Sequence, residues 1–353
     1  MRKGLLLLFV LLVIFSYDRF RRTLQELRNY VPEKLEKFQD FLSNKQSQNN
    51  ETHRLADIAV KVNKLKTTWT ATEYQRDYTP LLGALFDDLN SLPGGDVDKH
   101  ESLPEKYDAR EAYPKCESIR EIRDQANCNS CWAVAAAETM SDRICIKSKQ
   151  KDQRRISAQD LLSCCTSCGN SCNPGSPAAA WNYWKTNGIV TGGEYGDKKY
   201  CKPYFLPRCD HTSERVYGAC PRVVDAPGCE KNCNNGNKQS YTNEMTKASK
   251  VYAVSGEDKI MQEILNNGPV EATITVYEDF LTYKKGIYKH VYGNSQGGHA
   301  IKIIGWGVEK GTKYWLVANS WNENWGEKGF FRILRGNNEC GIERMAYTGI
   351  PRL

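Results

Sequence analysis

Two cysteines three positions apart mark the segment of this chain best suited to nucleophilic chemistry. Cys128 and Cys131 lie within residues 125–133, directly ahead of an alanine-rich run that predicts the start of a helix. The positive end of a helix dipole favours a thiolate over a thiol. Because the thiolate is the nucleophilic form of cysteine, the segment predicts a catalytic sulfur. Asn129, between the two cysteines, is the residue that fits this pattern least well.

A nucleophilic cysteine needs a base, and the base needs a group that orients it. Among the five histidines, His299 follows two glycines and precedes an apolar run. The glycines allow another backbone or a ligand to approach closely. Further along, Asn319 ends an apolar run and is followed by Ser320 and Trp321. Its amide could accept a hydrogen bond from one imidazole nitrogen, and the indole could keep water away from that bond.

The composition narrows the other classes of function. A chain of 353 residues can form one large domain or two medium ones. The formal net charge is +7, and the basic residues are scattered, which gives nucleic-acid binding little support. The apolar run from Leu5 to Phe15 follows Arg2 and Lys3 and falls short of the roughly 20 residues that span a bilayer. It therefore predicts a secretory signal over residues 1–16 rather than a membrane anchor.

The cysteines divide the chain into two parts. All 14 lie between Cys116 and Cys340. Behind a secretory signal, such a number indicates an oxidising compartment and disulfides. The cysteine-free front part therefore indicates a segment of a different kind ahead of a crosslinked domain. Two alternatives stay open here: any single cysteine of such a chain can be bridged rather than reactive, and the cluster Cys164-Cys165-x-x-Cys168 can be interpreted as a zinc site, although it lacks nearby histidines.

The elements that must position these residues are helical first and β-rich second. Residues 17–66 are charged and helix-prone, and residues 92–102 form a polar linker suited to proteolysis. Within the crosslinked part, we expect a helix after Cys131, a helix capped by Ser157, a long crosslinked loop over 164–240, and strands over 270–277, 299–305, 314–319 and 329–334. This pattern predicts an α+β fold with two halves.

Together these blocks resemble the papain-like cysteine proteases, and the cathepsin B branch in particular. The segments that match are 107–110, 125–133, 141–145, 267–271, 297–301, 314–325 and 349–351, with shorter matches at 62–64, 67–69 and 82–83. The resemblance covers residues 103–353. It implies a papain-like two-domain fold, with a helical left half, a β-barrel-like right half and the active-site cleft between them.

The resemblance also implies how the chain is divided. Residues 1–16 would be a signal peptide, 17–102 an inhibitory prosegment, and 103–353 the peptidase domain, with an occluding loop at about 201–233. The prosegment stretch 81–86, around Gly83, would lie through the cleft in the reverse direction. Its removal would occur between Gly94 and Leu103.

Carried over onto this sequence, Cys131 is the nucleophile and His299 the general base and acid. Asn319 orients His299, and Gln125 donates its amide to the oxyanion beside the Cys131 N–H. The implied disulfides are Cys116–Cys145, Cys128–Cys172, Cys164–Cys229, Cys165–Cys168, Cys201–Cys233 and Cys209–Cys220. They leave Cys131 and Cys340 unpaired.

The implied substrate-binding residues contain departures that affect specificity. They are Gly175, Ser176, Pro177, Thr273, Gly298, Ala300, Met345, His211 and Trp321. Met345 takes the place of a glutamate that accepts arginine, so we expect hydrophobic side chains at the second residue upstream of the cut. Thr212 replaces the second of two histidines that bind a substrate's C-terminal carboxylate. Weakened dipeptide removal, with endopeptidase activity retained, is therefore expected. The alternative is that His211 is an ordinary surface histidine.

Two further departures lie beside the nucleophile. Asn129 and Pro174 each replace a glycine of the family pattern. Asparagine tolerates left-handed backbone better than most residues, which would accommodate Asn129. Crowding of the cleft by these side chains keeps open an alternative function, that of a catalytically impaired homologue that binds or regulates.

The expected protein is thus a secreted or lysosomal cysteine endopeptidase made as a zymogen. No metal or cofactor is implied. The expected partners are protein or peptide substrates, its own prosegment and cystatin-type inhibitors, and the expected state is a monomer. Asn50 begins a glycosylation acceptor triplet. Residues 314–327 resemble a segment of gut cathepsins B from blood-feeding worms, which would place the enzyme in a gut lumen, although Asn324 departs from the usual aspartate.

Overall fold

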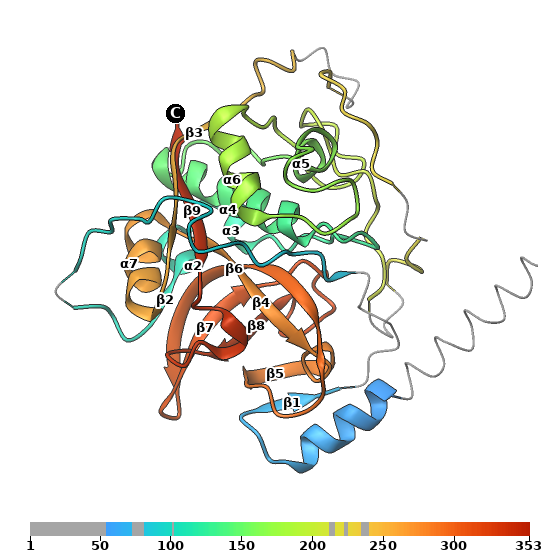
Figure 1. Cartoon of the computed structure of the whole chain (residues 1–353), viewed down its shortest axis with the longest axis vertical. Helices are drawn as coiled ribbons and strands as arrows, with labels where there is room; N and C mark the ends of the chain where they lie inside the picture. The colour runs from blue at the N-terminus through green and yellow to red at the C-terminus, as the bar shows by residue number, and fades with distance from the viewer. Residues whose placement is uncertain (1–53, 73–80, 101, 212–215, 222–224, 234–239) are drawn as a thin grey trace, which may run out of the picture. The chain divides into compact units, whose positions relative to one another are not determined.

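A computed structural model describes residues 54–72, 81–100, 102–211, 216–221, 225–233 and 240–353 (Figure 1). The signal segment, Asn50 and Thr212 lie outside the described residues. The chain divides into two units, 1–53 and 54–353, and the second contains every described residue.

The helical half is built around α4, Cys131–Lys147, whose residues from Cys131 to Cys145 are all buried. The helix begins at the cysteine, as the alanine-rich run predicts. Three shorter helices contact it: α3 (Glu117–Arg120), α5 (Ala158–Cys164) and α6 (Pro177–Thr186). Helix α2 (Ala109–Ala112) contacts α3 and the sheet. The Ser157 side chain accepts from the Asp160 N–H at the start of α5, which is the predicted cap.

Helix α6 corrects the expectation of an uninterrupted loop over 164–240. Ser176 caps it by accepting from the Ala179 N–H, and Pro177 occupies its first turn, where a missing N–H costs nothing. The three alanines that follow favour a helix. The surrounding Cys, Gly and Asn residues hid this ten-residue element within a loop-like composition.

The β-rich half is one mixed sheet. Its strands run in the order β1-β5-β8-β7-β6-β4-β9-β3, and β2 pairs with β6. The bounds are β1 Trp69–Ala71, β2 Tyr107–Asp108, β3 Lys247–Val254, β4 Val270–Tyr277, β5 Tyr283–Tyr288, β6 Ser295–Glu309, β7 Thr312–Ala318, β8 Phe330–Leu334 and β9 Ala346–Arg352. Helix α7, Glu257–Asn267, joins β3 to β4.

The sheet is not closed into a barrel, so the expected barrel-like form of this half is wrong. The terminal strands of the sheet, β1 and β3, each pair with one neighbour, and they do not pair with each other. Closure needs every strand to have two neighbours. Here the sheet packs around an aromatic core that includes Trp315, Trp321 and Trp325 instead.

Part of the expected prosegment is built into this sheet. A helix over residues 54–64 leads into β1, which pairs antiparallel with β5. Asn63 braces the connection, since its side chain both donates to the Ala71 carbonyl and accepts from the Ala71 N–H. The Trp69 ring packs 5.0 Å from the Tyr288 ring. The front part of the chain thus adds an edge strand to the sheet that carries His299.

Buried ion pairs join the two halves. Lys302 on β6 lies 3.0 Å from Asp142 on α4, and both side chains are fully buried. Arg143 on α4 pairs with Glu263 on α7 at 2.8 Å.

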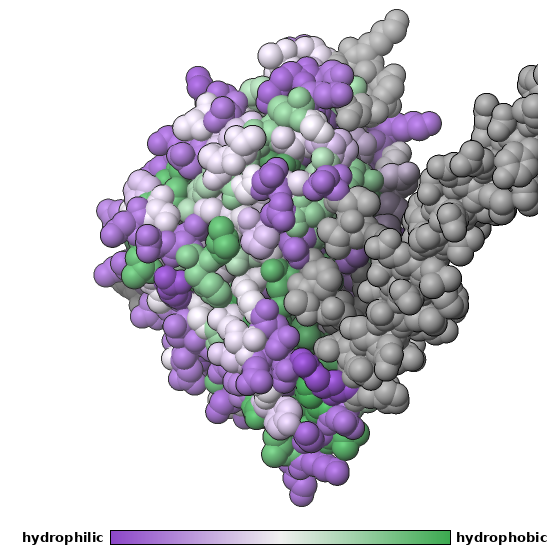
Figure 2. Space-filling model, turned by 45° about the vertical axis from the view of Figure 1, so that its right-hand side comes forward, coloured by the Kyte–Doolittle hydropathy of each residue, from purple (hydrophilic) through white to green (hydrophobic). Residues whose placement is uncertain are grey.

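On the face shown in Figure 2, hydrophobic residues form small groups among hydrophilic ones. Among the helices of the described residues, none has the length and apolar character needed to cross a membrane.

Candidate active site

Cys131 is the first residue of α4 and is fully buried. The backbone N–H of Gly83, from the front part of the chain, donates to its sulfur at 3.3 Å. Burial raises the pKa of the Cys131 thiol to about 11, although backbone hydrogen bonds from Ala300 and Gly83 oppose the rise. In this covered state, Cys131 is therefore a thiol at neutral pH.

His299 and Asn319 form a buried hydrogen-bonded pair. His299 lies on β6, and Asn319 directly follows β7; His299 Nε2 and Asn319 Oδ1 are 2.7 Å apart. The Ser320 N–H also donates to Oδ1, which identifies that atom as the amide oxygen. An amide oxygen only accepts, so Nε2 carries the proton and Nδ1 is the basic nitrogen. The Trp321 ring, 4.8 Å from the imidazole, shields the pair from water.

The charge of His299 is suppressed in this arrangement. Burial lowers the pKa of His299 to about 4, although the hydrogen bond to Asn319 and the nearby Leu81 backbone oppose the change. The imidazole is therefore neutral above that pH. A neutral imidazole can accept a proton from a thiol, which is what a general base must do.

Gln125 is fixed at both ends of its amide group. Its Oε1 accepts from the Ser320 hydroxyl at 2.7 Å. Its Nε2 donates to the Cys128 carbonyl at 2.8 Å and to the Leu81 carbonyl at 3.0 Å. The Leu81 carbonyl oxygen thus accepts a hydrogen bond from the amide group that, by the resemblance, stabilises the oxyanion.

The segment from Leu81 to Leu85, named the crossing strand, passes over the site and forms one isolated parallel β-bridge, between Ala84 and Gly175. Gly175 donates its N–H to the Gly83 carbonyl at 2.8 Å and accepts from the Leu85 N–H at 2.9 Å. On the opposite wall, the Gly298 carbonyl accepts from the Ala84 N–H at 3.1 Å. A Cβ added at Gly83 would lie 2.0 Å from the Asn129 carbonyl oxygen, so only glycine fits there.

The two departures beside the nucleophile are accommodated without the left-handed backbone expected for Asn129. Among the described non-glycine residues of this turn, Ala126 rather than Asn129 has a positive φ, of 51°. Asn129 borders Gly83 of the crossing strand, and its Oδ1 is buried without a hydrogen-bond partner. Pro174 leaves the pairing of the next residue, Gly175, intact.

The remaining predicted substrate-binding residues lie around the crossing strand. Thr273 on β4 is paired in register with Ala300 on β6, and Ala300 packs with Cys131 and Ala84. Met345 is 3% exposed and belongs to the apolar core of the helical half. Ser176 and Pro177 start α6.

Glu271, a buried acid near the site, is not among the site residues predicted from the sequence. It appears there only as the last residue of the matching block 267–271. Glu271 on β4 is fully buried; its Oε2 accepts from the Trp181 indole at 2.7 Å, and its Oε1 has no hydrogen-bond partner. Burial raises the pKa of Glu271 well above its usual range. No local pattern distinguishes this glutamate from an exposed one.

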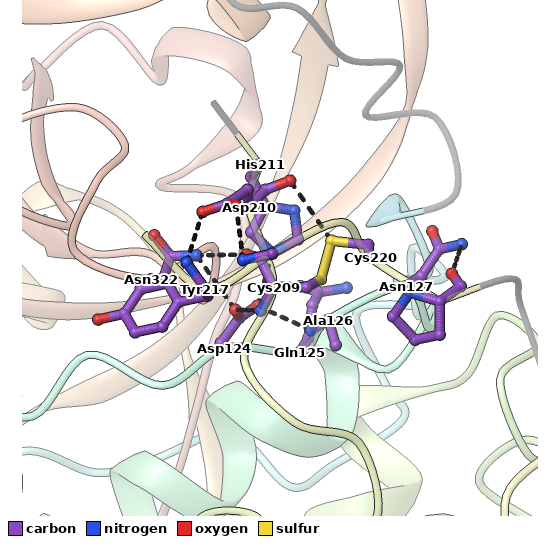
Figure 3. Close-up of a disulfide and its surroundings, with 12 residues drawn as sticks. Asp124, Gln125, Ala126, Asn127, Cys209, Asp210, His211, Tyr217, Cys220 and Asn322 are labelled. Atoms are coloured by element: carbon purple, nitrogen blue, oxygen red, sulfur yellow. Dashed lines mark hydrogen bonds and ion pairs between the residues drawn. A yellow bond between two sulfur atoms is a disulfide. The ribbon is translucent and has the colours of Figure 1, made fainter. Parts of the chain in front are cut away.

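His211 is tied to the rest of the molecule through Asp124 (Figure 3). His211 Nε2 lies 2.5 Å from Asp124 Oδ1, and Asp124 Oδ2 accepts from the Cys209 N–H and from Asn322 Nδ2. Burial alone would raise the pKa of Asp124, but His211 and these hydrogen bonds hold it below its usual value. Since His211 is fully buried, its interpretation as an ordinary surface histidine is wrong.

Six disulfides crosslink the domain, and they join the pairs that the resemblance implies. They are Cys116–Cys145, Cys128–Cys172, Cys164–Cys229, Cys165–Cys168, Cys201–Cys233 and Cys209–Cys220. The sulfurs of the Cys164-Cys165-x-x-Cys168 cluster are therefore all in disulfides. Cys131 and Cys340 are free thiols.

The residues that supply the thiol, the imidazole and the amide donor lie in a part of the chain whose sequence matches a known family. The model of the papain family cysteine proteases matches residues 103–350. The chain belongs to the papain family of cysteine proteases.

Within this family the chain is similar to cathepsin B-like enzymes. A cathepsin B-like cysteine proteinase of Schistosoma japonicum is 49% identical over 296 residues, covering 80% of this chain and 86% of the relative. Cathepsin B-like cysteine proteinase 5 of Caenorhabditis elegans is 47% identical over 305 residues, covering 83% and 89%. The chain is thus a cysteine peptidase with cathepsin B-like relatives.

Solved proenzymes share its fold. The proCathepsin B S9 of Trypanosoma congolense matches with a TM-score of 0.73 and 36% identity, covering 84% of this chain and 98% of that one. The digestive procathepsin L 3 of Tenebrio molitor matches with a TM-score of 0.62 at 20% identity, over 87% and 90%. Both neighbours confirm the α+β papain-like fold expected from the sequence, and the proCathepsin B neighbour supports the expected zymogen character.

Proposed function

We propose that this peptidase is a zymogen of a thiol endopeptidase that uses Cys131, His299, Asn319 and Gln125. The observation that carries the proposal is the position of the crossing strand. The Gly83 N–H lies on the Cys131 sulfur, and the Leu81 carbonyl lies on Gln125 Nε2. Backbone groups of the crossing strand therefore already form hydrogen bonds with both the nucleophile and the proposed oxyanion donor.

The chemistry follows from these groups. After His299 takes the thiol proton, the Cys131 thiolate attacks the substrate carbonyl carbon and forms a C–S bond. The carbonyl oxygen gains the negative charge, which Gln125 Nε2 and the Cys131 N–H stabilise. His299 then protonates the leaving amine as the C–N bond breaks. Water, deprotonated by His299, hydrolyses the acyl-enzyme and restores the thiol.

The front part acts as the inhibitor. Residues 1–16 would be a signal peptide, 17–102 the prosegment and 103–353 the mature peptidase with its loop at 201–233. The strand at 81–86 obstructs the site without being cut, since its reversed course places an N–H rather than a carbonyl carbon against the sulfur. Cleavage between Gly94 and Leu103 would free the cleft.

Specificity is proposed at two places. With Met345 in place of an acid, hydrophobic side chains are preferred at the second residue upstream of the cut, and arginine is disfavoured. With Thr212 in place of a second histidine, one charge-assisted hydrogen bond to a C-terminal carboxylate is lost, worth about 1.5–3 kcal/mol. Dipeptide removal is then weaker than endopeptidase cleavage.

The setting is the secretory pathway, ending in a lysosome or outside the cell, including a gut lumen. Relatives with disulfides and a prosegment are typical of these compartments. Glycosylation at Asn50, inhibition by cystatin-type proteins and a monomeric state are further parts of the proposal.

Peptide hydrolysis after acid activation tests the function. One peptide is offered with a free and with an amidated C-terminus, and Phe-Arg is compared with Arg-Arg substrates. We expect the amide to be cut at a rate comparable with the free acid, Phe-Arg to be preferred, and Cys131→Ala to abolish both activities. A strong free-acid preference would contradict the specificity proposal. Peptide binding without hydrolysis would favour the alternative, a catalytically impaired homologue, which rests on crowding of the cleft by the Asn129 and Pro174 side chains.

A further inference from the structure

The carboxylate of Asp87, in the proposed prosegment, is bound by hydrogen-bond donors at the edge of the proposed cleft. The Asp87 side chain uses both oxygens: the Ser176 hydroxyl donates to Oδ1 at 2.5 Å, and the Ala178 N–H donates to Oδ2 at 2.9 Å. The Ser176 hydroxyl also accepts from the Ala179 N–H at 3.0 Å, so its proton is left for the carboxylate. Each oxygen of the carboxylate thus accepts one hydrogen bond from the start of α6.

The local sequence prepares this position for an anion. The site lies at the N-terminus of α6, a ten-residue helix whose positive dipole end favours negative charge. The first turn of α6 contains no acidic residue of its own, and Pro177 there offers no N–H. The negative charge that such a helix start favours is therefore supplied by another segment of the chain, Asp87.

A second donor points to the same ligand from the other half of the molecule. Tyr347 on β9 is fully buried, and its hydroxyl lacks a partner that meets hydrogen-bond geometry. Burial raises the pKa of Tyr347, and the Asp87 carboxylate raises it further because the two groups face each other. Burial raises the pKa of Glu271, and the negative charge of Asp87 adds to the rise, so the neutral form of Glu271 is favoured.

The rim of the site adds a cation. The Arg344 guanidinium donates to the Asp87 carbonyl at 3.2 Å and lies 5.8 Å from the centre of the Phe86 ring. A surface cavity of about 320 Å³ borders Asp87, Ser176 and Ala178, so solvent reaches the position. Departure of the prosegment then leaves the Ser176 hydroxyl and the Ala178 N–H without their anion, and the Tyr347 hydroxyl stays without a partner.

We propose that the mature enzyme has a carboxylate-binding subsite at the start of α6 that selects substrates with an aspartate or glutamate upstream of the cut. The side of the cleft follows from the crossing strand, which runs from Leu81 on Gln125 past Gly175 to Asp87. This inference rests on the proposed endopeptidase function. It adds a preference for an acidic side chain to the hydrophobic preference proposed for the wall at Met345.

Synthetic peptides spanning residues 81–92 provide the direct test. Inhibition constants are measured at pH 6 and low salt against the full-length protein after acid activation, for the natural sequence and for the D87N and D88N peptides. Asp88 is the matched control, being an exposed carboxylate one residue away. We expect D87N to weaken inhibition about tenfold and D88N less than about twofold. Equal inhibition by all three peptides would overturn the subsite.

Enzyme variants and substrates locate the effect. Ser176→Ala and Tyr347→Phe should each shrink the difference between the natural and D87N peptides, which a merely structural role would not do. Substrates carrying Asp or Asn at the second, third or fourth upstream position should show an Asp preference of about tenfold at one of them. No preference at any position would contradict the proposal. Should the protein hydrolyse neither series, the endopeptidase function fails, while calorimetric binding of the same three peptides still decides the subsite.

Discussion

The protonation states of Cys131 and His299 depend on the strand that covers them. Burial raises the pKa of Cys131 to about 11 and lowers that of His299 to about 4. Between these values both groups are neutral in the covered state, Cys131 as a thiol and His299 as an imidazole. Water entering the uncovered cleft removes the burial that disfavours both charges. The prosegment therefore restrains the chemistry of the site as well as blocking access to it.

Acid should release the prosegment through His299. The uncovered imidazole binds a proton near its ordinary pKa of about 6.5, and the covered one only near 4. Between these values the uncovered state holds more protons, so lowering the pH favours it. The advantage of the covered state is complete above about pH 6.5 and falls by at most about 3 kcal/mol as the pH approaches 4.

Prosegment release is measured by intrinsic fluorescence against pH in the Cys131→Ser protein, which cannot cut itself. We expect the midpoint between pH 4 and 6.5, and a shallower dependence in a second variant that adds His299→Asn. Identical profiles for the two proteins would contradict a role for His299 in release.

Gln125→Ala should lower kcat about a hundredfold and leave KM nearly unchanged, because the amide acts on charge that develops in the transition state. The comparison is Ser320→Ala, which removes only the bond that holds Gln125 Oε1 and should cost less. Steady-state kinetics after acid activation measure both. An unchanged kcat in Gln125→Ala would show that Gln125 does not stabilise the oxyanion.

Individual elements differ in how far the sequence predicts them. Strand β4 covers 270–277 as predicted, and α4 begins at Cys131 because the alanine run follows it. Helix α6 is too short, and too closely surrounded by loop residues, to stand out. The open edges of the sheet depend on pairing between distant strands. The hydrogen bond between Ser176 and Asp87 joins residues 89 positions apart, and no local pattern encodes such a contact.

The crossing strand depends on the absence of a side chain at residue 83. Gly83→Ala should weaken prosegment inhibition about tenfold or more, because the new Cβ would lie 2.0 Å from a backbone oxygen. Gly94→Ala is the control, since nothing lies within 4 Å of a Cβ built there. Residual activity of each zymogen at neutral pH is the measurement. Matching activities in the two variants would show that the strand is not held by this close approach.

Across the whole molecule, buried charges join the helical half to the sheet. Lys302 and Asp142 are both fully buried, and removing one partner leaves the other charge uncompensated. Lys302→Ala should therefore lower the free energy of unfolding by about 3–5 kcal/mol. Lys313→Ala, which breaks an exposed pair with Glu257, should cost less than about 1 kcal/mol. Urea unfolding with the disulfides intact compares them, and equal costs would contradict the coupling of the halves.

The proposed function depends on Cys131 being a latent nucleophile that becomes reactive when the prosegment leaves. Labelling by an epoxide thiol inhibitor, located by peptide mass spectrometry before and after acid activation, measures this directly. We predict almost no label on the zymogen and stoichiometric label on Cys131 alone after activation. Absence of label on Cys131 after activation, or equal labelling of the zymogen, would contradict it.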